Sequence, residues 1–233
     1  MRRLVLVVAG GAAALAFWAA PAGATNECRG LMICVPIAGP WVVVPTGSTV
    51  PRPNVDLQLS CPRGFIVGGL DAELSTPGID VEFRATLGSP VNPGISTSQA
   101  AVFSGALVSG SARAPTFRPH IGCIPTTGGG ARVPTAVRVY PFGRPATLRV
   151  REIFVRPGVA HVAQRCKAGE TLVGATHAVG FFTAAPPSAL VARSVTAVRS
   201  VQGGAVRVDV RTTRELRGAR AVVQVGALCA GGS

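Results

Sequence analysis

The stretch CPRGFIVGGL, residues 61–70, has a near-copy farther along the chain, CKAGETLVGA at residues 166–175. Both copies begin with Cys-x-x-Gly, and both carry a glycine eight residues after the cysteine. Each also lies a nearly equal interval ahead of another cysteine, Cys123 or Cys229, that ends an apolar stretch. The pattern predicts one structural unit used twice, with the joint at TTGGGARVP, residues 126–134.

The six cysteines predict three disulfides, because an even number in an exported chain usually means complete pairing. The matching intervals predict the bridges Cys61–Cys123 and Cys166–Cys229, which leaves Cys28 for Cys34. A redox or zinc site is the alternative. It is disfavoured because no Cys-x-x-Cys occurs and the three histidines do not recur with the repeat.

The N-terminal residues 1–24 have the parts of a secretory signal peptide. Arg2 and Arg3 precede an uncharged apolar run from Leu4 to Ala20, and the small residues of PAGA follow at 21–24. A retained membrane anchor is the alternative, but the run is short for a span of ~20 residues. We expect a secreted, extracellular protein without a transmembrane anchor after cleavage.

Composition and periodicity predict an all-β protein. The chain is 48% hydrophobic but only 5% aromatic, and it is rich in valine and punctuated by 29 glycines and 19 prolines. In AVRVDVR, residues 205–211, valines alternate with Arg207, Asp209 and Arg211, as in a half-buried strand. The segment 187–200 fits either a strand or a short helix. We expect two tandem disulfide-stapled units, β-sandwich-like or jelly-roll-like, over residues 25–125 and 126–233.

Residues 66–87 are interpreted as a hairpin, with IVGGLDAEL and IDVEFRATL joined by STPG. Its core side would carry Leu70, Ala72, Leu74, Ile79, Val81 and Phe83. The glycines just inside the first strand are interpreted as structural, at a β-bulge or a close backbone approach.

The outward side of this hairpin would gather four carboxylates, with Glu73 opposite Asp80: Asp71, Glu73, Asp80 and Glu82. Like charges directly opposed on a sheet are destabilising, so something should offset them. Four interpretations stay open: a solvated acidic face, a surface for a basic partner, a Ca²⁺ site, or a glycosidase-like carboxylate pair.

The formal net charge of +13 is unevenly distributed. Residues 25–125 contain as many arginines as acids, whereas residues 126–233 hold nearly all of the excess positive charge. A basic sheet surface is predicted from Arg138, Arg149, Arg151, Arg207 and Arg211. Such a surface attracts wall polymers, acidic polysaccharides or nucleic acid, although a merely solubilising surface is equally consistent. No nucleic-acid motif occurs, and aromatic residues for base stacking are scarce.

The motif CPRGFIVGG, closing much later on GC or LC, resembles a motif of secreted actinobacterial proteins of unknown function. The second copy departs from it, with Lys167 at the position of Pro62 and Ala175 interrupting the Gly-Gly pair. The resemblance implies secretion and a β-rich fold, and it implies no particular activity.

The sequence favours a non-enzymatic binding module for anionic cell-surface polymers or polysaccharides, without a specific nucleic-acid partner. It contains no G-x-S-x-G elbow, and His120, His161 and His177 occupy non-corresponding places in the two copies. The alternatives are a secreted glycosidase-like hydrolase that uses the acidic cluster, and a structural surface protein without a small ligand.

Overall fold

The computed structural model describes residues 25–31, 33–47, 49, 51–84, 99–110, 113–125, 146–216 and 218–231. Strands dominate this described part, in which the helical elements are the short helix α1 (Ala189–Arg193) and a 3-10 turn at Arg214–Leu216. The predicted all-β fold is therefore confirmed. None of the described helices is long and apolar enough to cross a membrane.

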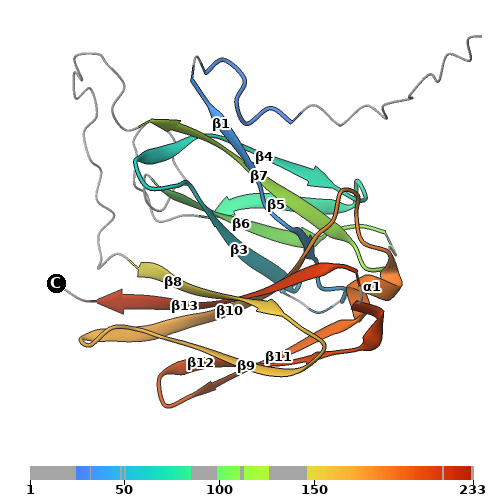
Figure 1. The fold of residues 1–233 in the computed structure, drawn as a ribbon. Coiled ribbons are helices and arrows are strands. Elements are labelled where there is room, and N and C mark those ends of the chain that lie inside the picture. Colours follow the sequence, from blue (N-terminus) through green and yellow to red (C-terminus); the bar gives the residue numbers. More distant parts are fainter. Residues whose placement is uncertain are drawn as a thin grey trace, which may run out of the picture.

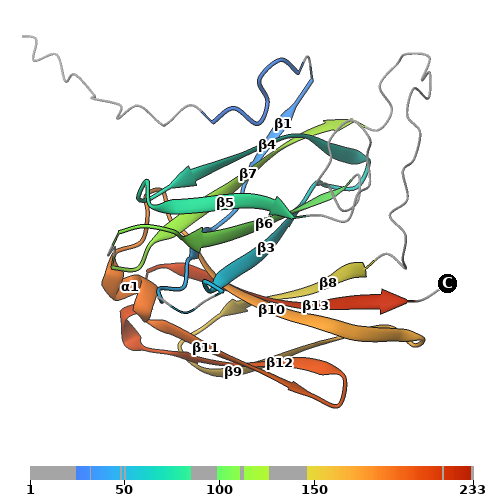
Figure 2. The same cartoon turned by 180° about the vertical axis from the view of Figure 1, so that it is seen from behind.

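The strands form one large sheet and two small ones (Figures 1 and 2). Sheet A contains β4 (Phe65–Leu74), β7 (Thr116–Pro125), β1 (Val35–Ala38), β2 (Trp41–Val43), β10 (Glu170–Phe182), β13 (Arg220–Gly231) and β8 (Ala146–Val155). Sheet B has the order β3 (Asn54–Ser60), β6 (Ala100–Leu107), β5 (Ile79–Arg84). Sheet C has the order β11 (Val195–Gln202), β12 (Ala205–Thr212), β9 (Gly158–Arg165).

The strand pairings of the two halves correspond. In the first half β7 lies between β4 and β1, and β6 lies between β3 and β5. In the second half β13 lies between β10 and β8, and β12 lies between β9 and β11. The short strand β2 pairs with both β7 and β10, so that sheet A is continuous from one half to the other. The predicted boundary after residue 125 adjoins residues 126–145, which lie outside the described part.

Each small sheet packs against sheet A across an aliphatic core. The first core joins sheets A and B through fully buried side chains such as Leu57, Phe103, Phe117 and Ile121. The second joins sheets A and C and includes the three buried valines of β12, Val206, Val208 and Val210. Arg207, Asp209 and Arg211 alternate with these valines and are exposed, as the period of two predicted.

All three predicted disulfides are present: Cys28–Cys34, Cys61–Cys123 and Cys166–Cys229. Each long bridge ties the segment just before β4 or β10 to the strand that pairs with it, β7 or β13. The register of both strand pairs shifts at the same place, between Val67 and Gly69 and between Leu172 and Gly174. Both copies of the repeated motif thus form the same local structure, a disulfide-bonded cysteine followed by a β-bulge.

Gly69 also allows a close backbone approach. A Cβ atom at Gly69 or at Gly122 would collide with the backbone carbonyl of Glu27. The N-terminal segment 25–31 therefore lies against β4 and β7 on the side of sheet A that faces away from the first core. The two structural reasons expected for these glycines, a β-bulge and a close backbone approach, therefore both apply.

The predicted hairpin at residues 66–87 is wrong. Strand β4 pairs with β7 in sheet A, whereas β5 pairs with β6 in sheet B. The connection at Ser75–Gly78 carries the chain from one sheet to the other, and Ser75 exchanges hydrogen bonds with Thr116 there. A corner between sheets and a hairpin turn share the same proline and glycine chemistry, so the short-range pattern did not separate them. The segment 187–200 forms both predicted alternatives in turn, α1 and then β11.

Candidate functional site

The four acids of the predicted cluster do not meet. Asp71 and Glu73 lie on β4 beside core-facing Leu70, and point away from the first core on the outer side of sheet A. Asp80 and Glu82 lie on β5 beside core-facing Ile79 and Val81, on the outer side of sheet B. The packed core therefore separates the two pairs. The single Ca²⁺ site built from all four acids is wrong, because it required β4 and β5 to be partners.

The β4 acids instead hold the N-terminal segment in place. Asp71 accepts a hydrogen bond from the backbone N–H of Asn26 at 2.6 Å. Glu27 is 4% exposed, and its Oε1 lies 3.8 Å from Nδ1 of buried His120. Nε2 of His120 lies 3.5 Å from Oε1 of Glu73. These contacts give Asp71 and Glu73 a structural role at the seam between the segment and the sheet.

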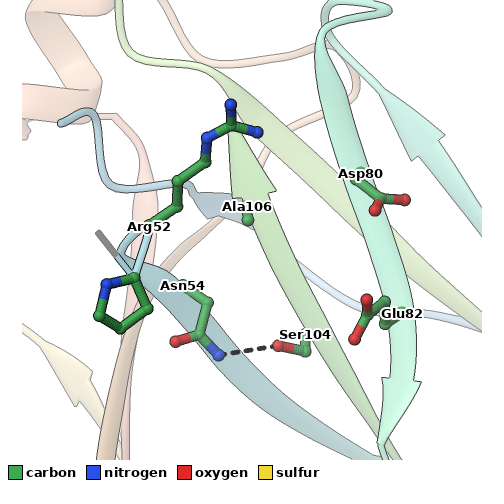
Figure 3. A pocket seen from close by; sticks show the side chains of 7 residues that line it. Arg52, Asn54, Asp80, Glu82, Ser104 and Ala106 are labelled. Atoms are coloured by element: carbon green, nitrogen blue, oxygen red, sulfur yellow. Dashed lines mark hydrogen bonds between the residues drawn. The ribbon is translucent and has the colours of Figure 1, made fainter. Parts of the chain in front are cut away.

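The β5 acids line a small pocket of about 280 Å³ on the outer side of sheet B, together with Pro51, Arg52, Asn54, Ser104 and Ala106. Figure 3 shows Asp80 and Glu82 on the same strand, with the Glu82 carboxyl group turned toward Ser104. The Asn54 side-chain amide donates hydrogen bonds to the Ser104 hydroxyl, at 2.9 Å, and to the Asp56 carboxylate, at 3.1 Å. The pocket is polar and holds charges of both signs.

The predicted basic sheet surface is not continuous. Arg207 and Arg211 are exposed on β12 of sheet C, but Asp209 lies between them, with its carboxylate Oδ1 2.7 Å from Nδ1 of His161. Arg149 and Arg151 belong to β8 of sheet A. Arg138 lies outside the described residues.

The prediction that Arg149 and Arg151 lie on the outer side of their sheet is also wrong. They pair with Ala227 and Val225, whose side chains are buried in the second core, and cross-strand partners point to the same side of a sheet. Because β8 is an edge strand, its first half extends past the core, where long side chains reach polar partners. Arg151 donates to the carbonyl of Ala163 on β9.

Arg149 forms a salt bridge with Glu170. Its guanidinium donates two hydrogen bonds to the carboxylate of Glu170, at the start of β10, and the backbone N–H of Lys167 donates a third at 2.8 Å. The Arg149 hydrogen bonds lower the pKa of Glu170 to about 2, and the pKa of Arg149 is raised. Arg149 is thus a structural residue rather than a free ligand-binding cation.

A second concave feature, larger than the pocket of sheet B, is a groove of about 1160 Å³ between the two halves. Its walls come from residues 43–47 at the end of β2, from residues 107–110 and 113–114 between β6 and β7, and from α1, which is labelled in Figures 1 and 2. Its lining residues are Val43, Val44, Pro45, Thr46, Gly47, Arg52, Leu107, Val108, Ser109, Gly110, Arg113, Ala114, Ala192 and Arg193.

Among the described residues, three arginines and no acid line this groove. Arg52, Arg113 and Arg193 are exposed, and none of them forms an ion pair with another described residue. Arg193 is oriented at the end of α1 by a hydrogen bond from its Nε to the carbonyl of Ala189, at 3.1 Å. A cluster of arginines without nearby carboxylates provides forked donors suited to phosphate or carboxylate groups.

The backbone fixes the walls of the groove. The N–H of Val44 donates to the carbonyl of Pro115 at 2.8 Å, which ties the chain after β2 to the start of β7. The N–H of Val108 donates to the carbonyl of Gly78 at 2.9 Å. Ser188 caps α1 by accepting a hydrogen bond from Val191 N. The groove is therefore largely preformed.

Sequence reasoning missed the groove arginines because they come from three separate segments, two of them outside any regular element. No local pattern marks Arg52, Arg113 or Arg193 as neighbours. Among the described residues one cluster has metal-ligand geometry, Cys166, Glu170 and Cys229, but its two sulfurs form a disulfide and its carboxylate binds Arg149.

We compared the chain with protein-family models, curated proteins and solved structures, and none of them matched it.

Proposed function

We propose that this protein is a secreted, non-enzymatic module that binds anionic cell-surface polymers through the groove between its halves. The observation that carries the proposal is the set of three arginines in a preformed concavity whose lining contains no carboxylate. The lining also contains no histidine, cysteine or acid that could act as a general acid or base, which favours binding over catalysis. The three disulfides are compatible with an extracellular location.

The groove arginines are tested with a charge-matched comparison. We expect the double variant Arg113→Gln/Arg193→Gln to bind long-chain polyphosphate at least tenfold more weakly than the unmodified protein in 0.1 M salt. The control, Arg207→Gln/Arg211→Gln on sheet C, removes the same charge from an exposed face outside the groove. Titration calorimetry at several salt concentrations measures both.

A comparison of the two double variants distinguishes a defined binding site in the groove from diffuse electrostatic attraction by the whole protein. Equal loss of affinity in both would mean that net charge alone attracts the polymer, and would overturn the groove as its site. Unchanged affinity in the groove variant would overturn it as well. A steep decrease of groove binding with salt is expected, because the arginines are exposed and screened within about 8–10 Å.

A second candidate function is supported by the polar pocket of sheet B. Asp80 and Glu82 stand two positions apart on one side of β5, about 7 Å along the strand backbone. Both line one pocket, as a glycosidase acid and base would. A secreted hydrolase that uses this pair is the alternative to the binding module.

The hydrolase alternative is decided by a reducing-end assay on a panel of neutral and acidic polysaccharides. The binding module predicts no product above the buffer background. A hydrolase predicts product formation that falls at least a hundredfold in both Asp80→Asn and Glu82→Gln, while Asp209→Asn on sheet C keeps full activity.

A further inference from the structure

The groove contains more than cations. Among the described residues, the lining includes no aromatic ring and seven aliphatic residues: Val43, Val44, Pro45, Leu107, Val108, Ala114 and Ala192. Val44 and Ala192 are only 1% and 4% exposed, so the aliphatic surface that a ligand can reach comes from the other five. Val108 is 40% exposed although it lies in a concave surface, so part of this aliphatic area is open to a ligand. Sugar chains and nucleobases present flat faces that stack on aromatic rings, which this groove does not offer.

The combination of aliphatic walls and unpaired guanidinium groups has a specific chemical complement. An acyl chain gains free energy by covering aliphatic surface, roughly in proportion to the area removed from water. A phosphate or carboxylate at the end of that chain gains charge-assisted hydrogen bonds from arginine. The groove volume of about 1160 Å³ exceeds that of a typical small-molecule pocket, so both parts of such a ligand fit together.

We propose that the groove binds an anionic single-chain amphiphile, with the acyl chain along the aliphatic walls and the phosphate or carboxylate on Arg113 and Arg193. This inference rests on the proposed function and specifies its ligand: the acylated end of an anionic surface polymer, rather than its repeating units. Arg52 lines both the groove and the acidic pocket of sheet B, so Arg113 and Arg193 are the cations farther from Asp80 and Glu82 in the lining.

Three probes separate the parts of the ligand. Dodecyl phosphate carries chain and charge, ethyl phosphate carries charge alone, and dodecyl maltoside carries the chain with an uncharged head. All are used below their critical micelle concentrations with the full disulfide-bonded protein. We expect dodecyl phosphate to bind at least tenfold more tightly than either of the others, and octyl phosphate to fall between dodecyl and ethyl phosphate. A negative heat-capacity change should accompany chain burial.

Two pairs of variants locate the interaction. Val108→Ser should weaken dodecyl phosphate binding several-fold and leave ethyl phosphate unchanged, whereas Val159→Ser, at an exposed valine of sheet C, should change neither. Arg113→Gln should weaken both phosphates, and Arg211→Gln should weaken neither. Far-ultraviolet circular dichroism and melting curves confirm that each variant is folded.

The outcomes distinguish this inference from the function on which it rests. If dodecyl and ethyl phosphate bind equally while polyphosphate still requires Arg113 and Arg193, the amphiphile is overturned and the anion-binding groove stands. If no phosphate probe and no polyphosphate binds, the proposed function itself fails. If dodecyl maltoside binds as tightly as dodecyl phosphate, the site is apolar only, and the role of the arginines is overturned.

Discussion

Arginine, at the residue scale, performs two different tasks in this chain. Arg149 is locked by two hydrogen bonds to Glu170, whose side chain is only 8% exposed, and it links β8 to the start of β10 across β13. Arg113 and Arg193 have no carboxylate partner among the described residues and face a concavity. Partner and surroundings, rather than residue type, decide whether an arginine is structural or available to a ligand.

The Arg149–Glu170 pair makes a prediction for acid stability. The pKa of Glu170 is lowered to about 2 in the folded state, from an ordinary value near 4.5. A lowered carboxyl pKa stabilises the folded state at pH above the unfolded value, and this stabilisation is lost as pH falls toward 2. We expect Glu170→Gln to melt at a lower temperature than the unmodified protein at pH 7.

The difference between the two proteins should shrink as the pH falls below 4.5 and should be mostly lost at pH 2, where the Glu170 carboxyl is about half protonated even in the folded state. Melting curves recorded from pH 7 to pH 2 measure it. Asp80→Asn, at an exposed carboxylate, serves as the control and should follow the unmodified protein throughout. A difference that persists undiminished at pH 2 would show that packing, rather than charge, is responsible.

Strands and bridges, at the element scale, could be predicted from the sequence where the signal is local or repeated. The alternation in residues 205–211 identified β12 and its buried face, and the matched cysteine intervals identified all three disulfides. The Gly-Gly motif at 68–69 indicated a bulge and a close approach, and both are present.

The partner of each strand could not be predicted in the same way. The periodicity of β4 and β5 shows which side of each strand is apolar, but both a hairpin and a corner between sheets satisfy it. On β8, Arg149 and Arg151 lie on the core side. They are tolerated there because the first half of this edge strand extends past the core, which only its second half covers. The groove depends on tertiary neighbours, so no spacing in the chain marked its lining residues.

Sheet A, at the scale of the whole molecule, makes the two halves one structure. Strand β2 joins the halves within the sheet, and Gln224 on β13 joins them a second time across the sheets. Its side-chain amide accepts from the N–H of Gln58 on β3, at 2.7 Å, and donates to the carbonyl of the same residue, at 2.8 Å. Gln224 thereby occupies the open edge of β3 in the way that a neighbouring strand would.

Removal of this amide should therefore weaken the whole fold. Gln224 is 2% exposed, so Gln224→Ala leaves the Gln58 backbone without these partners in a partly buried place, and we expect a loss of about 2–4 kcal/mol in the free energy of unfolding. Urea unfolding should still show one transition. Gln202→Ala, at an exposed glutamine of β11, should cost less than about 0.5 kcal/mol. Two separate transitions in the unmodified protein would contradict the coupling.

The two long disulfides also give the chain a mechanical property. Cys61–Cys123 and Cys166–Cys229 span 62 and 63 positions, and the loops that they close contain β4 to β7 and β10 to β13. A chain pulled from its ends can therefore unfold while the residues inside those loops remain unextended. At about 3.5 Å per extended residue, each intact bridge withholds roughly 220 Å of length. Under tension at a cell surface, the oxidised protein would behave as a short tether, and reduction of a single bridge would lengthen it abruptly.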